Sequence, residues 1–133
     1  MRRGFTLLEL VIVIVIIAIL AALAIPQYMI TTERARAAEG LLILDAVRNS
    51  QIRYYARWAD YSDDGDKLDY SIESPRFFKD IYPVASGGYI CMVNRNSVQY
   101  AYDMRYTLSI DADGNIVCSD NGCSVPICSK MGY

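Results

Sequence analysis

The chain opens with an apolar run that is long enough to cross a membrane. Between Phe5 and Pro26, in "FTLLELVIVIVIIAILAALAIP", the only charged residue is Glu9. A helix of roughly 20 apolar residues spans the hydrocarbon core of a bilayer. A charge in lipid costs roughly 2.5–3.5 kcal/mol at the middle of a helix and less near its end, so Glu9 needs a partner or a function. Tyr28 follows the run, where aromatic side chains lie at the membrane surface.

The rest of the chain has the length of one ordinary domain, and its composition excludes several function classes. The 133 residues carry a net charge of −2 and contain no histidine. Without histidine, the commonest general base and metal ligand is missing, and so are the Ser/His and Cys/His hydrolase patterns. No basic patch lies outside the first residues, so no nucleic acid is expected as a partner. We therefore expect neither an enzyme nor a protein with a cofactor or metal.

A second helical segment is expected over residues 31–58. It contains no proline and is rich in Ala, Leu, Glu and Arg. Apolar residues recur on one face at helical spacing: Ile43, Leu44, Val47, Tyr54, Tyr55 and Trp58. Asp45, Asn49, Arg53 and Arg57 follow at intervals of four on another face. The apolar face predicts packing against a sheet from the same chain.

The second half of the chain has the pattern of antiparallel β-structure. The polar stretch "ADYSDDGDKLDYSIESPRFF" ends the helix, and a short helical piece is expected over residues 76–81. The stretch "GGYICMV" predicts a strand, and "SVQYAYDMRYTLSI" alternates with period two and is long enough to split near Asp103. "DADGN" predicts a hairpin turn to a last strand, "NIVCS". The predicted fold class is α+β, a long N-terminal α-helix packed on a small antiparallel sheet.

Two acidic segments are the candidate cation sites. Residues 111–115, "DADGN", lack the distal glutamate of a calcium loop, and we interpret them as a turn. Residues 62–69, "SDDGDKLD", bring more carboxylates together, and calcium binding is an alternative to a solvated loop there.

Four cysteines lie in the C-terminal third: Cys91, Cys118, Cys123 and Cys128. An even number after a membrane-targeting segment predicts two disulfides in an oxidising compartment. Three pairings are possible; Cys91 and Cys118 could pair across the sheet, which leaves Cys123 and Cys128 to close "CSVPIC". Four reduced thiols are the alternative, and zinc is disfavoured because no CxxC spacing is present.

The opening "RRGFTLLEL", the unbroken apolar helix and Pro26 resemble the type IV pilins and the pseudopilins of type II secretion systems. The stretch "ERARAAEGL" is also similar to the one that follows in many pilins. The resemblance covers about the first 28 residues, and the rest matches only in layout. A secretory signal peptide cut after "ALA" at residues 22–24, or a plain membrane anchor, leaves Glu9 unexplained.

The resemblance implies specific roles for residues at the N-terminus. A prepilin peptidase is expected to cut between Gly4 and Phe5, and the new amine of Phe5 to be N-methylated. Glu9 is then expected to form an assembly salt bridge with the Phe5 amine of a neighbouring subunit, and Pro26 to kink the helix. Many family members carry glycine at the position of Ala18, so melting of the helix between Ala18 and Pro26 is left open.

The resemblance also implies a domain plan and a function. Residues 1–4 are the leader, 5–28 the transmembrane and filament-core helix, and 29–133 the periplasmic or extracellular domain. The expected function is a structural pilin that polymerises into an extracellular filament for adhesion or motility. Its partners are copies of itself, the inner membrane before assembly, the prepilin peptidase and methylase, and the assembly machinery. A type II secretion pseudopilin is the alternative. A minor pilin for DNA uptake ranks third, because its basic patch would have only Arg53 and Arg57.

Overall fold

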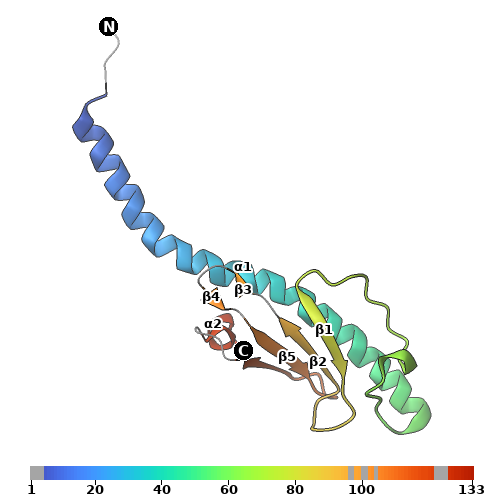
Figure 1. Cartoon of the computed structure of the whole chain (residues 1–133). Coiled ribbons are helices and arrows are strands. Elements are labelled where there is room, and N and C mark those ends of the chain that lie inside the picture. Colours follow the sequence, from blue (N-terminus) through green and yellow to red (C-terminus); the bar gives the residue numbers. More distant parts are fainter. Residues whose placement is uncertain (1–4, 96–97, 100–101, 104, 122–125) are drawn as a thin grey trace.

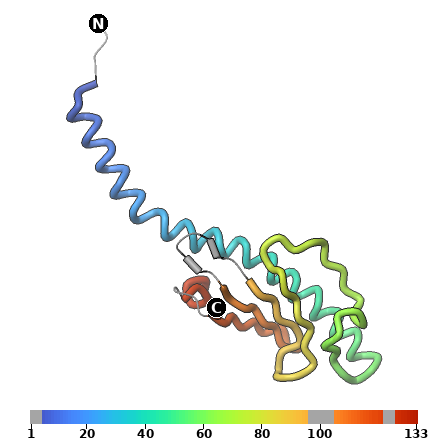
Figure 2. Tube along the Cα trace, in the orientation of Figure 1, coloured from blue at the N-terminus to red at the C-terminus, as the bar shows by residue number. Residues whose placement is uncertain are grey.

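A computed structural model describes residues 5–95, 98–99, 102–103, 105–121 and 126–133. One long helix, α1 (Leu7–Trp58), forms about two-fifths of the chain. Its first half projects away from the rest of the protein, and its second half lies against a small sheet (Figure 1). Figure 2 shows that the helix curves along its length as it leaves the domain. The predicted α+β class is therefore confirmed.

The helix ends where the sequence pattern predicts. Ala59 follows Trp58 with φ +56°, a left-handed conformation that terminates the helix, and its N–H donates to the carbonyl of Tyr55 at 2.8 Å. Pro26 lies inside α1, which continues through it, so the helix is not melted between Ala18 and Pro26. The strong helix formers before it offset the one backbone hydrogen bond that proline removes.

The main sheet has four antiparallel strands. Their order is β1 (Phe78–Pro83), β2 (Cys91–Arg95), β5 (Tyr106–Ile110) and β6 (Ile116–Asp120). The short strands β3 (Val98–Gln99) and β4 (Tyr102–Asp103) pair with each other in a second sheet. The long alternating segment therefore splits, as expected near Asp103. The predicted turn at residues 111–115 is also present, with the Asn115 N–H donating to Asp111 Oδ1 at 2.8 Å.

Three local elements differ from the sequence predictions. The helical piece expected over residues 76–81 is wrong, because β1 forms there and pairs with β2. A one-turn 3-10 helix, η1 (Gly65–Lys67), and a C-terminal helix, α2 (Ile127–Met131), were not expected. Pairing with a neighbouring strand overrides weak local propensity, and only the tertiary structure provides that neighbour.

The core lies between the second half of α1 and the sheet. Its largest fully buried apolar side chains are Tyr106, Phe78, Leu44, Leu108, Ile127, Val47 and Val93. Gly40 lets the helix approach the sheet closely, since a Cβ there would lie 2.7 Å from Phe78 Cζ.

The predicted apolar face of α1 is only partly buried. Ile43, Leu44 and Val47 lie in the core, but Tyr55 is 47% exposed and Trp58 70% exposed. The last turns of the helix extend beyond the strands, so part of this face has no sheet to cover it (Figure 1).

Candidate functional site

The first half of α1 presents an apolar surface to its surroundings. An 18-residue window of this half is long and apolar enough to cross a membrane, and none of it is buried within the chain. Leu7, Ile14 and Leu23 are each more than half exposed. Exposed apolar patches of this extent on a protein mark a site for lipid or for another protein.

Glu9 and Thr6 close the N-terminus of this helix with reciprocal hydrogen bonds. The Glu9 Oε2 accepts from the Thr6 N–H at 2.9 Å and from the Thr6 hydroxyl at 2.8 Å. The Glu9 N–H donates to Thr6 Oγ1 at 3.3 Å. This arrangement is a capping box, whose signature, a threonine followed three residues later by glutamate, is present in "TLLE". The sequence interpretation of Glu9 overlooked this local role.

Of the other predicted N-terminal residues, the structure describes Phe5. Phe5 precedes the cap and is 83% exposed, and Gly4 lies outside the described residues. Both bonds to the Glu9 carboxylate fall on Oε2, and a carboxylate has further acceptor positions for a second donor.

A buried charged cluster joins α1 to the sheet where the helix enters the domain. Glu33 is fully buried, and its carboxylate accepts from Arg95 Nε at 2.6 Å, from Arg36 Nη1 at 3.2 Å and from the Tyr106 hydroxyl at 3.3 Å. Arg95 also donates through Nη1 to the Phe77 carbonyl at 3.2 Å. Burial, followed by the Glu33 charge, raises the pKa of Tyr106 above its usual range. The cluster therefore links α1 to β2 and β5.

Of the pairings that the sequence left open, the one that joins Cys91 to Cys118 is absent from the structure. The structure joins Cys118 in β6 to Cys128 in α2, with a sequence separation of 10. Cys91 is a buried free thiol in β2, and burial raises its pKa to about 12. Cys91 pairs in register with Ile110 of β5, so it has no cysteine opposite it. Cys123 lies outside the described residues.

The disulfide works with a helix cap to hold the C-terminal segment. The Asp120 Oδ1 accepts from the N–H groups of Ile127 and Cys128 at 3.1 and 3.2 Å. The Arg34 Nη2 donates to the Lys130 carbonyl at 2.6 Å, which attaches α2 to α1. These contacts hold α2 beside the helix at the end of the domain from which the apolar half of α1 projects (Figure 1).

The acidic loop, residues 62–69, is held by contacts within itself and with α1. The Asp69 carboxylate accepts from Arg53 Nη2 at 2.8 Å and from the Ser50 hydroxyl at 2.6 Å, and these bonds lower its pKa. Asp64 caps η1 by accepting from the Asp66 N–H at 3.1 Å. Within the part of the chain that the structure describes, no group of three or more His, Cys, Asp or Glu side chains is placed to hold a metal ion.

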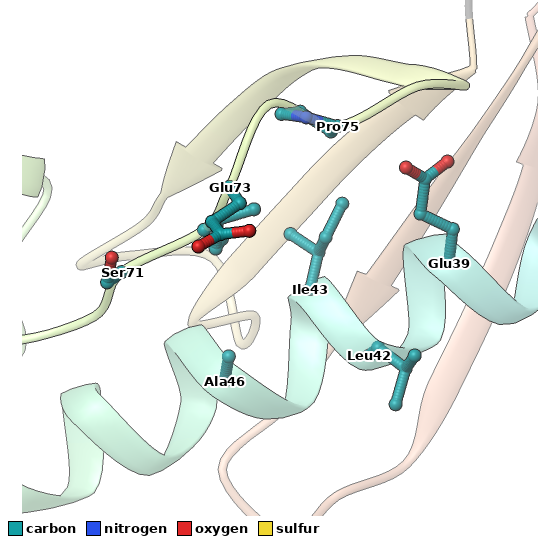
Figure 3. Close-up of a pocket in the computed structure, with 8 residues that line it drawn as sticks. Glu39, Leu42, Ile43, Ala46, Ser71, Glu73 and Pro75 are labelled. Carbon is teal, nitrogen blue, oxygen red and sulfur yellow. The ribbon is translucent and has the colours of Figure 1, made fainter.

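A recess of about 250 Å³ lies between α1 and the segment that leads to β1 (Figure 3). Leu42, Ile43 and Ala46 line it from the helix, and Glu73 from the facing segment. Glu39, at its edge, accepts from two backbone N–H groups of that segment, at 2.5 and 2.8 Å. The recess therefore offers a largely apolar contact surface.

Comparisons with known proteins match the N-terminal part of the chain. The prokaryotic N-terminal methylation motif matches residues 1–25. The type IV major pilin protein PilE1 of Neisseria gonorrhoeae is 44% identical over 55 residues, which cover 41% of this chain and 33% of that protein. The type IV major pilin protein PilA of Myxococcus xanthus is 38% identical over 72 residues, 54% of this chain and 33% of that protein.

A third relative has a similar extent of match. The type IV major fimbrial protein FimA of Dichelobacter nodosus is 50% identical over 48 residues, 36% of this chain and 30% of that protein. The chain thus matches about a third of the length of these relatives. No solved structure matches it.

Proposed function

We infer that this chain, which carries the N-terminal methylation motif and helix sequence of the type IV pilin family, is a structural subunit that polymerises into an extracellular pilus. The observation that carries the proposal is the exposed apolar half of α1. A single subunit can remove this surface from water only in lipid or against other helices. Burial of each large apolar side chain contributes roughly 1.5–3 kcal/mol before the entropy of association is subtracted.

The proposed life cycle divides the chain into three parts. Residues 1–4 are a leader that is removed between Gly4 and Phe5, after which the Phe5 amine is methylated. Residues 5–28 hold the subunit in the inner membrane as a single span and later pack in the filament core. Residues 29–133 form the globular domain, which lies outside that membrane and then on the filament surface. Intact-mass analysis of the membrane-extracted protein tests the cut, and a mature chain that retains Met1 contradicts it.

We assign Glu9 two compatible roles in this cycle. Its carboxylate caps α1 through Oε2, as the structure describes, and in the filament it also accepts from the cationic amine of Phe5 on a neighbouring subunit. Each charge is costly in an apolar core by itself, and the two together offset part of that cost. The proposed pair sets the register of one helix against the next.

Three variants separate the assembly role of Glu9 from its capping role. Glu9→Gln keeps a capping side chain but removes the charge, Glu9→Ala removes both, and Thr6→Ala removes the cap and keeps the carboxylate. All three should insert in the membrane and be cut after Gly4, because the Gly4–Phe5 bond is unchanged. Both Glu9 variants should accumulate without filaments, whereas Thr6→Ala should still assemble, since a lost cap costs only about 1 kcal/mol.

The measurement compares membrane-bound subunit with filaments sheared from the cell surface, whose subunit is identified by mass spectrometry. Recovery of the subunit from surface filaments distinguishes a pilin from a periplasmic pseudopilin. Normal filament yield from Glu9→Gln would disprove the charge-pairing role. Failure of Thr6→Ala to the same degree as Glu9→Gln would assign the assembly defect to the helix cap.

A further inference from the structure

Basic side chains from three separate segments lie in two groups around α1 where it leaves the domain. Arg34 of α1 contacts the carbonyl of Lys130 in α2 at 2.6 Å, so these two residues lie together. The guanidinium carbons of Arg36 and Arg76 lie 5.3 and 5.4 Å from the ring centroid of Phe77, just before β1. We call Arg34, Arg36, Arg76 and Lys130 the basal cluster. Arg34 and Arg36 flank the buried face of α1 on its two sides, so the cluster extends around the helix.

Two acidic groups beside the basal cluster are turned into the fold. Glu33 is fully buried in its bonds with Arg95, Arg36 and Tyr106. The two oxygens of Glu39 accept from the backbone N–H groups that precede β1. In contrast, the side chains of Arg34, Arg76 and Lys130 are exposed. These three cations are therefore exposed at this end of the domain, where Asp120 is an exposed anion that caps α2.

The opposite end of the domain carries exposed acidic side chains. Asp60, Asp63 and Asp66 are exposed in the loop that follows α1, at the far end of the helix from the apolar half (Figure 1). Arg57 and Lys67 are also exposed at that end, so the distal end carries charges of both signs, whereas the side chains of the basal cluster are all basic.

Helix geometry places Arg34 and Arg36 close to the lipid headgroups when the apolar half of α1 is in a membrane. Arg34 and Arg36 follow Tyr28 by six and eight residues, which is about 9–12 Å along a helix. Side chains on a helix lean toward its N-terminus, and so toward the membrane here. The headgroup layer is about 5–8 Å thick on each side of the hydrocarbon core, within reach of these long side chains.

We propose that the basal cluster binds the phosphates of anionic phospholipids and holds the domain of the unassembled subunit against the membrane surface. This inference rests on the proposed insertion of α1 in the inner membrane. Arginine forks match phosphate oxygens in geometry, and Arg36 and Arg76 are held in place by their contact with Phe77. A basic residue near an anionic surface favours the docked domain by roughly fivefold. The acidic loop after α1 is then kept away from the lipid by repulsion.

A photocrosslinking experiment on the full-length chain tests the proposal. In one variant a benzophenone amino acid replaces the exposed Ser129, next to Lys130. In a control variant of the same chain it replaces the exposed Asp63 at the distal end. Each is reconstituted in vesicles of phosphatidylcholine alone or of phosphatidylcholine mixed with phosphatidylglycerol. The yield of lipid adducts is then measured by mass spectrometry. At Ser129 the yield should rise at least fivefold with phosphatidylglycerol and fall again in high salt, and at Asp63 it should stay low.

Charge variants identify the residues responsible. Arg34→Gln, Arg76→Gln and Lys130→Gln together should reduce the Ser129 adducts to the level seen in phosphatidylcholine. The matched control, Arg57→Gln with Lys67→Gln at the distal end, should change nothing. Equal adduct yields in the two kinds of vesicle, or a triple variant that behaves like the parent, would overturn headgroup docking. Flotation with the vesicles is measured in parallel: a chain that fails to float refutes membrane insertion as well, whereas one that floats with equal yields refutes docking alone.

Discussion

Removal of the Glu33 charge should destabilise the domain strongly. Glu33 is fully buried and lies 2.6 Å from Arg95, which is only 6% exposed. Glu33→Gln keeps the size of the side chain but leaves the Arg95 guanidinium buried without its counter-charge. Breaking a buried ion pair in this way costs roughly 3–5 kcal/mol. Since a domain is stable by only about 5–15 kcal/mol, the variant should lose a large fraction of its free energy of unfolding.

A double variant separates the ion pair from the packing around it. Glu33→Met combined with Arg95→Met removes both charges and fills the space with apolar groups, which is often neutral or stabilising by about 1–4 kcal/mol. The Tyr106 hydroxyl then loses an acceptor, at a cost of about 1–3 kcal/mol. These two effects oppose each other, so the double variant should be more stable than Glu33→Gln.

The assay is urea unfolding of the full chain in detergent micelles, followed by near-ultraviolet circular dichroism of the tyrosines in the domain. Lys67→Gln is the control, because its pair with Asp64 is exposed, 3.4 Å long, and expected to contribute less than about 1 kcal/mol. A midpoint for Glu33→Gln equal to that of the control, or a double variant less stable than Glu33→Gln, would refute the assignment of Glu33 and Arg95 as a coupled buried pair.

Three further predictions follow from the core and the C-terminal segment. Cys118→Ser with Cys128→Ser should destabilise the C-terminal segment by roughly 2–3 kcal/mol, seen as faster proteolysis there, and non-reducing peptide mapping should recover the linked pair. The free energy of unfolding should fall as pH rises above about 9. Burial raises the pKa of Cys91 from 9.0 to about 12 and that of Tyr106 above 10.0. The unfolded chain therefore loses these two protons at a lower pH than the folded chain does. Measurement of the urea midpoint as a function of pH checks this, and a midpoint that does not change with pH contradicts it. Gly40→Val should cost about 1–3 kcal/mol in the same assay, because its Cβ would lie 2.7 Å from a ring carbon of β1.

Local patterns in the sequence determined the elements that depend on neighbours along the chain. Helical periodicity placed the end of α1 at Trp58, and period-two alternation located β5 and the split before it. The apolar run from Phe5 to Pro26 identified the surface that needs lipid or other subunits. The capping box of Thr6 and Glu9 was also readable, since its signature spans only four residues. These features need no information about distant segments.

The tertiary structure alone decided which distant groups meet. Glu33 and Arg95 are 62 positions apart, and nothing in either local sequence indicates that the carboxylate is buried or that this arginine pairs with it. The partner of Cys118 likewise depended on α2, which forms where α1 and Asp120 hold it. A periodic pattern indicates which face of a helix or strand is apolar. The segment that packs against that face is decided by the tertiary fold. The burial of Glu33, its ion pair with Arg95 and the disulfide of Cys118 all depend on contacts between segments that are distant in the sequence.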